Sequence, residues 1–141
     1  MVTRPMSIRV APDLLARLDR TSREEGMTRS ELAKTLMEEG LRMAEHPGIV
    51  FRPGPAGRRP ALAGGPDVWE VIRLFLQLHE TAEATITRTA ELASLAPDQV
   101  RVALRYYAAY RDEIDEWIRI VDEEAERVEA AWEREQALLR R

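Results

Sequence analysis

The feature that most constrains the fold is a short alternating segment near the N-terminus, residues 6–10. Met6, Ile8 and Val10 are apolar, and the residues between them are polar. A period of two predicts a β-strand with one buried face. A lone strand leaves its backbone hydrogen bonds unpaired, and about 44 residues bury too little surface to form a core alone. The simplest solution is a second copy of the segment, paired antiparallel across a two-fold axis.

Two helices are expected after this strand. The first begins at Pro12, which suits the first turn of a helix, and ends before Gly26, which suits a left-handed C-terminus. The second begins at Thr28, because Thr28 and Glu31 have the spacing of a capping box. Its leucines continue at helical spacing to about Ala44.

In this order, residues 5–44 resemble the ribbon-helix-helix (Arc/MetJ/CopG-like) DNA-binding family. The resemblance is carried by the alternating strand, the Pro-Asp helix start, Leu-Leu-x-x-Leu in the first helix, and Gly-Met-Thr-Arg-Ser-Glu-Leu before the second. It implies an intertwined homodimer whose paired strands enter the major groove of operator DNA. The alternative, from the residues alone, is an edge strand whose polar side chains face solvent.

The resemblance also implies which side chains touch DNA. The outward positions of the strand are Ser7 and Arg9, and the Arg9 guanidinium has the geometry to bond guanine O6 and N7 together. Pro5 stands at the third outward position, where a polar residue is expected, so that this base contact is shifted to Arg4 or lost. The phosphate anchor at the start of the second helix is expected at Thr28, Arg29 and Ser30.

Charge is distributed unevenly along the chain. Residues 1–65 hold 11 basic and 8 acidic residues, a net charge of +3, whereas residues 112–141 hold 5 and 11, a net charge of −6. A mildly basic front and an acidic tail suit a chain that binds nucleic acid at one end and another partner at the other. A solvated acidic helix explains the tail equally well.

The composition excludes several classes of function. The chain has no cysteine, which excludes disulfides, thiolate catalysis and cysteine-ligated zinc. No apolar run approaches the ~20 residues that span a bilayer, and the N-terminus has no apolar signal segment, so a cytoplasmic location is expected. The histidines lie far apart, and no paired-carboxylate or metal-ligand spacing occurs in a context that would form a cleft, so no enzymatic activity, metal or cofactor is expected.

Residues 46–66 are rich in proline and glycine and are expected to connect two modules. Two short apolar runs, residues 49–51 and 61–62, flank the turn Gly54-Pro55-Ala56-Gly57 and predict a small hairpin. The two glycines lack the strand-and-helix context of a phosphate-binding loop. Next to the turn, Arg58 and Arg59 form a basic spot, which is either a phosphate contact or a solvated turn.

The chain after the connector, residues 67–111, is expected to form a helical module. Asp67 caps a helix that is apolar on more than one side, and two further helices span residues 82–111. Joined by a short turn, these two have the length of a DNA-reading helix-turn-helix, which Arg101 and Arg105 could support. The packing of a core explains the same helices.

Three parts of this region resemble a second family. They are His46-Pro47-Gly48-Ile49, Asp67-Val68-Trp69 and Val100-Arg101-x-Ala103-Leu104-x-Tyr106-Tyr107. Together they are similar to a small helical domain of unknown function found in some VapB-like antitoxins. The resemblance implies a helix-turn-helix-like module beside a DNA-binding module in a toxin–antitoxin pair.

Residues 112–141 are expected to form one amphipathic helix. Glycine and proline are absent, and a 4-3-4-3-4 spacing relates the apolar residues Ile114, Ile118, Val121, Ala125, Val128 and Trp132. Such a seam packs along a partner helix or groove. In one interpretation it docks on residues 67–111 or on a dimer mate. In the other it binds a different protein.

The two resemblances imply that this other protein is a toxin of the PIN type, a ribonuclease that holds Mg²⁺ in a cluster of carboxylates. The expected contact residues are Trp117, Ile118, Val121, Arg127, Val128 and Trp132, with the two tryptophans as anchors. A basic side chain of the antitoxin can compete with the metal, and the candidates are Arg119, Arg127 and Arg134.

The fold expected from the sequence is therefore mainly α-helical with a short N-terminal β-strand. It comprises a ribbon-helix-helix domain for DNA binding and dimerisation (1–45), a connector (46–66), a helix-turn-helix-like module (67–111) and a partner-binding helix (112–141). The expected function is that of a type II antitoxin that binds its own operator as a homodimer or higher oligomer and neutralises a PIN-like ribonuclease toxin. The alternative is a stand-alone transcriptional regulator with an oligomerisation tail.

Overall fold

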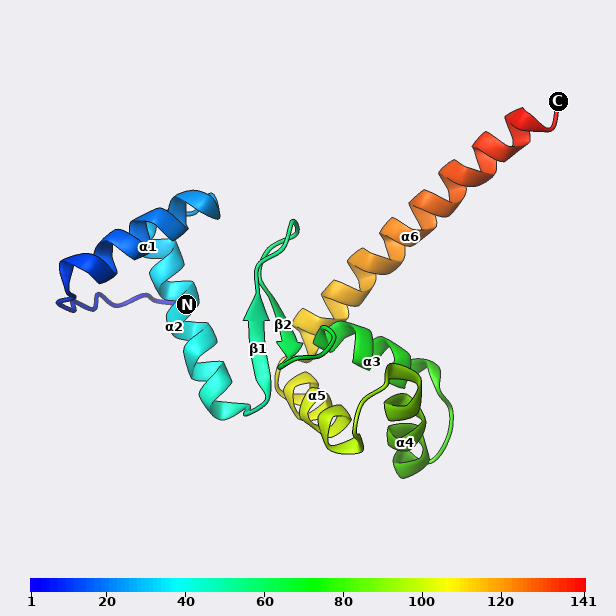
Figure 1. Ribbon diagram of the computed structural model, residues 1–141, viewed down its shortest axis with the longest axis horizontal. Coiled ribbons are helices and arrows are strands. Elements are labelled where there is room, and N and C mark those ends of the chain that lie inside the picture. The colour runs from blue at the N-terminus through cyan, green and yellow to red at the C-terminus, as the bar shows by residue number, and fades with distance from the viewer. The chain divides into compact units, whose positions relative to one another are not determined.

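The computed structural model describes residues 1–141 and is mainly helical, with one two-stranded antiparallel sheet (Figure 1). The helices are α1 (Pro12–Glu24), α2 (Arg29–Glu45), α3 (Val68–Gln77), α4 (Ala82–Ala93), α5 (Pro97–Ala109) and α6 (Arg111–Leu139). The strands are β1 (Ile49–Arg52) and β2 (Arg59–Leu62). The chain divides into two compact units, Met1–Arg42 and Met43–Arg141. None of the six helices combines the length and the apolar character needed to cross a membrane.

The starts of the helices follow local sequence chemistry. At the start of α2, the Glu31 amide donates to the Thr28 hydroxyl at 3.1 Å, and the Thr28 amide donates to the Glu31 carboxylate at 3.0 Å. This is the expected capping box. At the start of α3, the Asp67 amide donates to the Glu70 carboxylate at 3.0 Å. Between α1 and α2, Gly26 has a φ of 67°, which few residues other than glycine adopt.

Residues 1–11 have no regular secondary structure in the single chain, and the strand predicted at residues 6–10 is not formed there. A strand needs a neighbouring backbone to pair with, and the sheet of this chain is made by β1 and β2 instead. The ribbon-helix-helix arrangement requires a second copy of the segment. It therefore stays a prediction.

The N-terminal unit has almost no apolar core of its own. Its buried residues are Ser22, Leu32 and Glu39, of which only Leu32 is apolar. Folded domains normally bury apolar side chains and leave most polar ones in water. Hydrophobic packing within one chain therefore contributes little to the stability of these helices.

The strands β1 and β2 form a hairpin around the Gly-Pro-Ala-Gly turn. In the turn, the Gly57 amide donates to the Gly54 carbonyl at 3.0 Å. The register pairs Ile49 with Leu62, and both side chains are buried in the core of the second unit. The segment rich in proline and glycine is therefore a packed part of this unit.

The core of the second unit lies between the hairpin, α3, α4, α5 and the start of α6. It consists of Ile49, Leu62, Val68, Val71, Ile72, Ile86, Ala90, Val100, Ala103, Tyr106 and Ile114. Helix α5 is central, because it contacts both strands and helices α3, α4 and α6. From α5, Tyr106 is fully buried, and the rings of His46 and Phe51 pack edge-on against it with centroids 5.3 and 6.3 Å away.

Helix α6 is 29 residues long, and only its first part packs on the unit. Ile114 is buried and Ile118 packs against the core. Farther along, Arg73 of α3 donates to the Asp122 carboxylate at 2.8 Å. All but two of the residues after Asp122 are exposed, and the helix extends away from α3, α4 and α5 (Figure 1). Residues 123–139 are called the distal half of α6 below.

Candidate functional site

The three residues predicted to read bases lie in the irregular N-terminal segment, residues 1–11. Arg4, Ser7 and Arg9 are all exposed. No carboxylate of the chain pairs with either guanidinium, so both arginines are available to an anionic ligand. The single chain does not fix the direction of these side chains, because the segment has no partner strand.

The predicted phosphate anchor lies at the start of α2. The capping box engages the backbone amides of Thr28 and Glu31, while those of Arg29 and Ser30 have no acceptor in the chain. Backbone amides at a helix N-terminus are suited to bind an anion. The Arg29 guanidinium lies 3.5 Å from the Asp19 carboxylate in an exposed ion pair, which is weak enough for a phosphate to replace.

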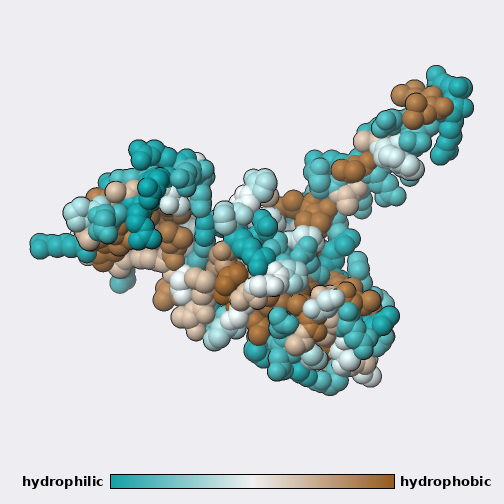
Figure 2. Space-filling model, in the orientation of Figure 1, coloured by the Kyte–Doolittle hydropathy of each residue, from teal (hydrophilic) through white to brown (hydrophobic).

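A patch of apolar side chains covers the surface of the N-terminal unit. Met6 and Ile8 are each 66% exposed, and Leu41 of α2 is 61% exposed. Further members of the patch are Val10, Leu14, Leu36 and Met37. Figure 2 shows hydrophobic side chains gathered on α1 and α2 among hydrophilic ones. These are the residues at which the sequence predicts a buried face, and the single chain leaves them in water.

In the helix pair α4–α5, the alternative DNA-reading element, Arg88 and Arg101 are paired with carboxylates, whereas Arg105 is exposed and has no carboxylate partner. Arg101 donates to the Glu83 carboxylate at 2.8 Å and to the Asp98 carboxylate at 3.3 Å. Arg88 likewise pairs with Glu91 at 3.3 Å. These ion pairs are exposed, so a phosphate could replace them as it could the pair of Arg29. The inner faces of both helices contribute to the core.

The predicted partner-binding residues fall into two groups. Trp117 and Val121 are half-buried, and Ile118 packs against the core of the unit, so these residues lie where α6 meets α3 and α5. In contrast, Val128 is 61% and Trp132 is 57% exposed. The interpretation in which the helix docks on its own module describes the first group, whereas the second group remains open to another protein.

The three arginines considered as competitors for a toxin metal differ in their surroundings. Arg119 donates to the Glu123 carboxylate at 2.6 Å and to the Glu116 carboxylate at 2.8 Å. These two carboxylates raise the pKa of Arg119 above its usual value. Arg127 pairs with Glu124. Only Arg134 has no carboxylate partner in the chain. It is therefore the arginine whose charge is free to act on another protein.

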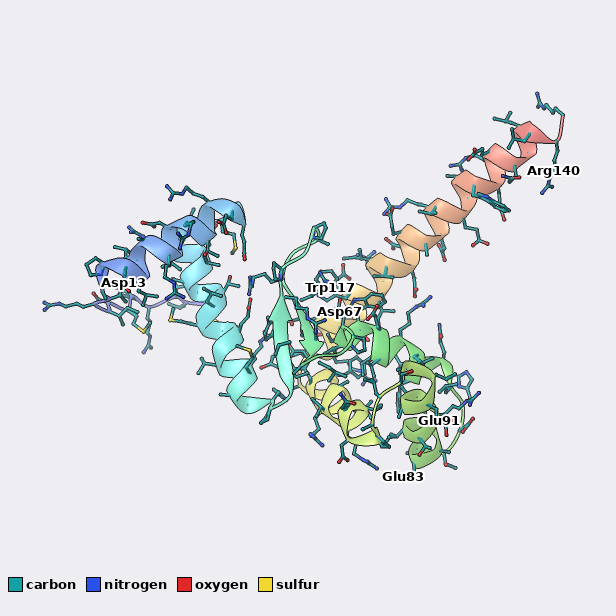
Figure 3. The ribbon with its side chains drawn as sticks, in the orientation of Figure 1. Asp13, Asp67, Glu83, Glu91, Trp117 and Arg140 are labelled. Atoms are coloured by element: carbon teal, nitrogen blue, oxygen red, sulfur yellow. The ribbon has the colours of Figure 1, made fainter.

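Asp67 is the centre of a charged cluster that the sequence did not predict. Its carboxylate accepts from Arg59 and from the Trp69 indole, the latter at 3.1 Å, and lies 3.9 Å from Arg52. Arg52 in turn donates to the Gly65 carbonyl at 2.8 Å. Figure 3 shows Asp67 where the hairpin meets α3. Arg59, one of the two arginines of the expected basic spot, thus bonds to Asp67 and holds the hairpin on the unit.

An open depression of about 360 Å³ is lined by Arg58, Glu113, Glu116, Trp117 and Ile120. No group of three or more His, Asp or Glu side chains is arranged to hold a metal ion. Exposed apolar side chains occur on the N-terminal unit and on the distal half of α6, and Leu76 and Leu92 of the second unit are also exposed. Comparison of the chain with protein-family models, with curated proteins and with solved structures gives no match.

Proposed function

We propose that this chain is the antitoxin of a type II toxin–antitoxin pair. In this proposal, a homodimer of the N-terminal unit binds the operator of its own gene pair in the cytoplasm. The C-terminal part binds and neutralises a PIN-like ribonuclease toxin. The observation that carries the proposal is the exposed apolar patch of the N-terminal unit, together with the unpaired alternating segment that contains two free arginines.

A second copy of the chain is the occupant that suits this patch. Two copies of residues 6–10, paired antiparallel, would satisfy the backbone hydrogen bonds that one copy leaves open. The same pairing would bury Met6, Ile8 and Val10 against the leucines of the two α2 helices. Each square ångström of apolar surface removed from water contributes about 25 cal/mol, so the dimer is favoured over two exposed units.

Dimerisation also determines which side chains reach DNA. Because side chains alternate along a strand, burial of Ile8 turns Ser7 and Arg9 to the opposite face. A two-stranded ribbon fits the major groove, where Arg9 would bond guanine. The free amides of Arg29 and Ser30 would hold a backbone phosphate. Residues 1–44 carry a net charge of only +1, so specific binding depends on two subunits acting together.

The distal half of α6 supports the second part of the proposal. Val128 and Trp132 form an exposed apolar face on the part of α6 that extends past the packed core of the second unit. A helix of this kind binds in an apolar groove, with a tryptophan as its main anchor. Arg134, which has no carboxylate partner, is the side chain that we assign to the carboxylates of the toxin.

A stand-alone transcriptional regulator is the second candidate. The packing of Ile114 and Ile118 on the core favours it, because this part of α6 has a structural role without any toxin. The regulator keeps the DNA-binding dimer and uses the rest of α6 for oligomerisation. The two candidates differ in one respect, which is whether the product of a neighbouring gene binds the chain.

Co-expression with the product of the adjacent gene tests the antitoxin proposal. We expect the two proteins to purify as one complex and the ribonuclease activity of the partner to be suppressed in it. Trp132→Glu should release that activity, whereas Ala137→Glu, which adds the same charge to the opposite face of α6, should not. If the full-length chain neither binds nor inhibits the adjacent product, the regulator is the better description.

A further inference from the structure

We propose that the distal half of α6 pairs antiparallel with the distal half of α6 from a second copy of this chain. The pairing creates an interface separate from the N-terminal unit. It does not rest on the proposed function, because its argument uses only α6 and the depression beside it. It uses the same face of α6 that the proposed function assigns to the toxin, so the second copy and the toxin compete for that face.

The apolar face of the distal half continues the face that packs on the core. At 3.6 residues per turn, Val121, Val128, Trp132 and Leu139 fall within about 40° of one another around the helix axis. Ile114 and Ile118, which pack on α3 and α5, lie on the same side. Residues 111–139 contain no glycine or proline that would let the helix fold back. The helix therefore cannot cover its own distal face, which is free for another chain.

One antiparallel register matches this face with itself. With the two-fold axis at Ala130, Val128 packs against Trp132 of the second copy, and Val121 packs against Leu139 of the second copy. These contacts occur twice by symmetry and give four apolar layers in the manner of a coiled coil. In the remaining two layers, Glu135 of one copy lies against Ala125 of the other. Because alanine is small, it leaves space for the Glu135 carboxylate to reach water.

Neighbouring registers are less favourable. A shift of the second copy toward the unit would require Ile114 and Ile118 to pack on it, but both already pack on the core. A shift in the other direction would bury the carboxylate of Glu135 against Trp132, and burial of an unpaired charge is costly. Only the register centred on Ala130 uses the exposed apolar side chains and avoids both problems.

Charge favours the antiparallel over the parallel arrangement. Residues 119–126 hold one basic and four acidic residues, a net charge of −3, and residues 134–141 hold three basic and one acidic, a net charge of +2. The antiparallel register places these opposite segments side by side. A parallel pair would place −3 against −3 and Glu135 against its own copy.

The depression on the second unit lies where the end of the second helix arrives. In this register Leu138 and Arg140 of the second copy come next to Ile120. Ile120 and Trp117 line the depression, with the carboxylates of Glu113 and Glu116 also on its wall. Arg58 also lines this depression and Glu116 is bonded to Arg119, so its apolar side chains are what the depression offers to Leu138 of the second copy. Figure 3 shows Trp117 at the base of the projecting helix and Arg140 at its far end.

The strength of the pairing follows from its size. The distal half is 17 residues long, which corresponds to about 26 Å of helix. Four apolar layers over that length predict a weak, concentration-dependent association rather than an obligate one. Glu129 lies beside its own copy near the axis, so Glu129→Gln should strengthen the pairing by removing a like-charge contact.

Single cysteines test the register, because the natural chain has none. In the full-length protein, a short bis-maleimide should join two copies of Ala131→Cys, since the two positions lie beside the axis. It should not join two copies of Arg141→Cys, which are about 33 Å apart in the antiparallel pair and adjacent in a parallel one. Addition of Trp132→Glu should abolish the Ala131→Cys product, whereas Ala137→Glu should leave it unchanged.

Two results would overturn the inference. One is efficient joining at both positions, which means a parallel pair. The other is no joining at Ala131→Cys at any accessible concentration, which leaves the distal face to a different protein. DNA binding by the Trp132→Glu variant distinguishes failure of the α6 pairing from failure of the proposed DNA-binding function. We expect DNA binding to be retained, because the N-terminal unit is unaltered.

Discussion

Asp67→Ala should destabilise the second unit more than any other exchange of a charged residue in it. Asp67 is only 8% exposed and accepts hydrogen bonds from Arg59 and from the Trp69 indole. Its negative charge also lies at the N-terminus of α3, where the helix dipole favours it. Removal of the carboxylate loses all three interactions and leaves two arginine side chains without their anion.

The magnitude follows from these contacts. A hydrogen bond to a charged group contributes about 1.5–3 kcal/mol, and the lower end applies here because Arg59 is partly exposed to screening water. The indole bond adds about 1 kcal/mol and the helix dipole about 0.5 kcal/mol. We expect a loss of about 3 kcal/mol, which corresponds to a melting temperature at least ~12 °C lower for a unit of this size.

Urea unfolding followed by tryptophan fluorescence measures this loss, because all three tryptophans lie in the second unit. Asp98→Ala is the matched control. Asp98 is also in the first turn of a helix and also pairs with an arginine, but its side chain is 95% exposed, so we expect a change of ~0.5 kcal/mol or less. A loss below about 1 kcal/mol for Asp67→Ala would refute the role of the cluster in holding the hairpin.

Four further predictions follow from the same structure. Ile72→Ala should cost about 2–5 kcal/mol in the same urea assay, because the side chain is fully buried. Thr28→Ala should lower the stability of α2 by about 1 kcal/mol, measurable by circular dichroism, whereas Thr28→Ser should not. Ile8→Asp should break the proposed N-terminal dimer; sedimentation velocity in a Trp132→Glu background, which removes the proposed α6 pairing, should then give a monomer, and an unchanged mass would contradict the ribbon. Arg101→Ala should leave the affinity for DNA unchanged in a filter-binding assay, because the proposed base and phosphate contacts all lie in the N-terminal unit.

The helices and the hairpin were predictable because their signals are local. A capping box, a proline in the first turn and a glycine at a turn each act over a few residues. Thus α2 begins with the bonds expected between Thr28 and Glu31, and the two apolar runs around the Gly-Pro-Ala-Gly turn do pair. Absence of glycine and proline likewise predicted one long helix after residue 111, as observed.

Features that depend on partners distant in the sequence, or on a second chain, were not predictable in this way. The alternation at residues 6–10 predicts a strand, but no strand forms in one chain because the pairing backbone is missing. Arg59 reads as a solvated turn residue, whereas it is bonded to Asp67. The apolar residues of α6 keep the same spacing along the whole helix. Ile118 nevertheless packs on the core, whereas Trp132 is exposed, because α3 and α5 reach only the first part of the helix.

The most direct test of the account is fluorescence anisotropy with the DNA upstream of the coding region, at two salt concentrations. Wild type should bind a palindromic site specifically, and Arg9→Ala should lose about 1–3 kcal/mol per subunit because it removes a bidentate base contact. The control, Arg20→Ala, removes the same charge from the exposed surface of α1 and should keep the sequence preference. Equal binding by wild type and Arg9→Ala, or no binding by either, would contradict the claim that the N-terminal segment reads DNA.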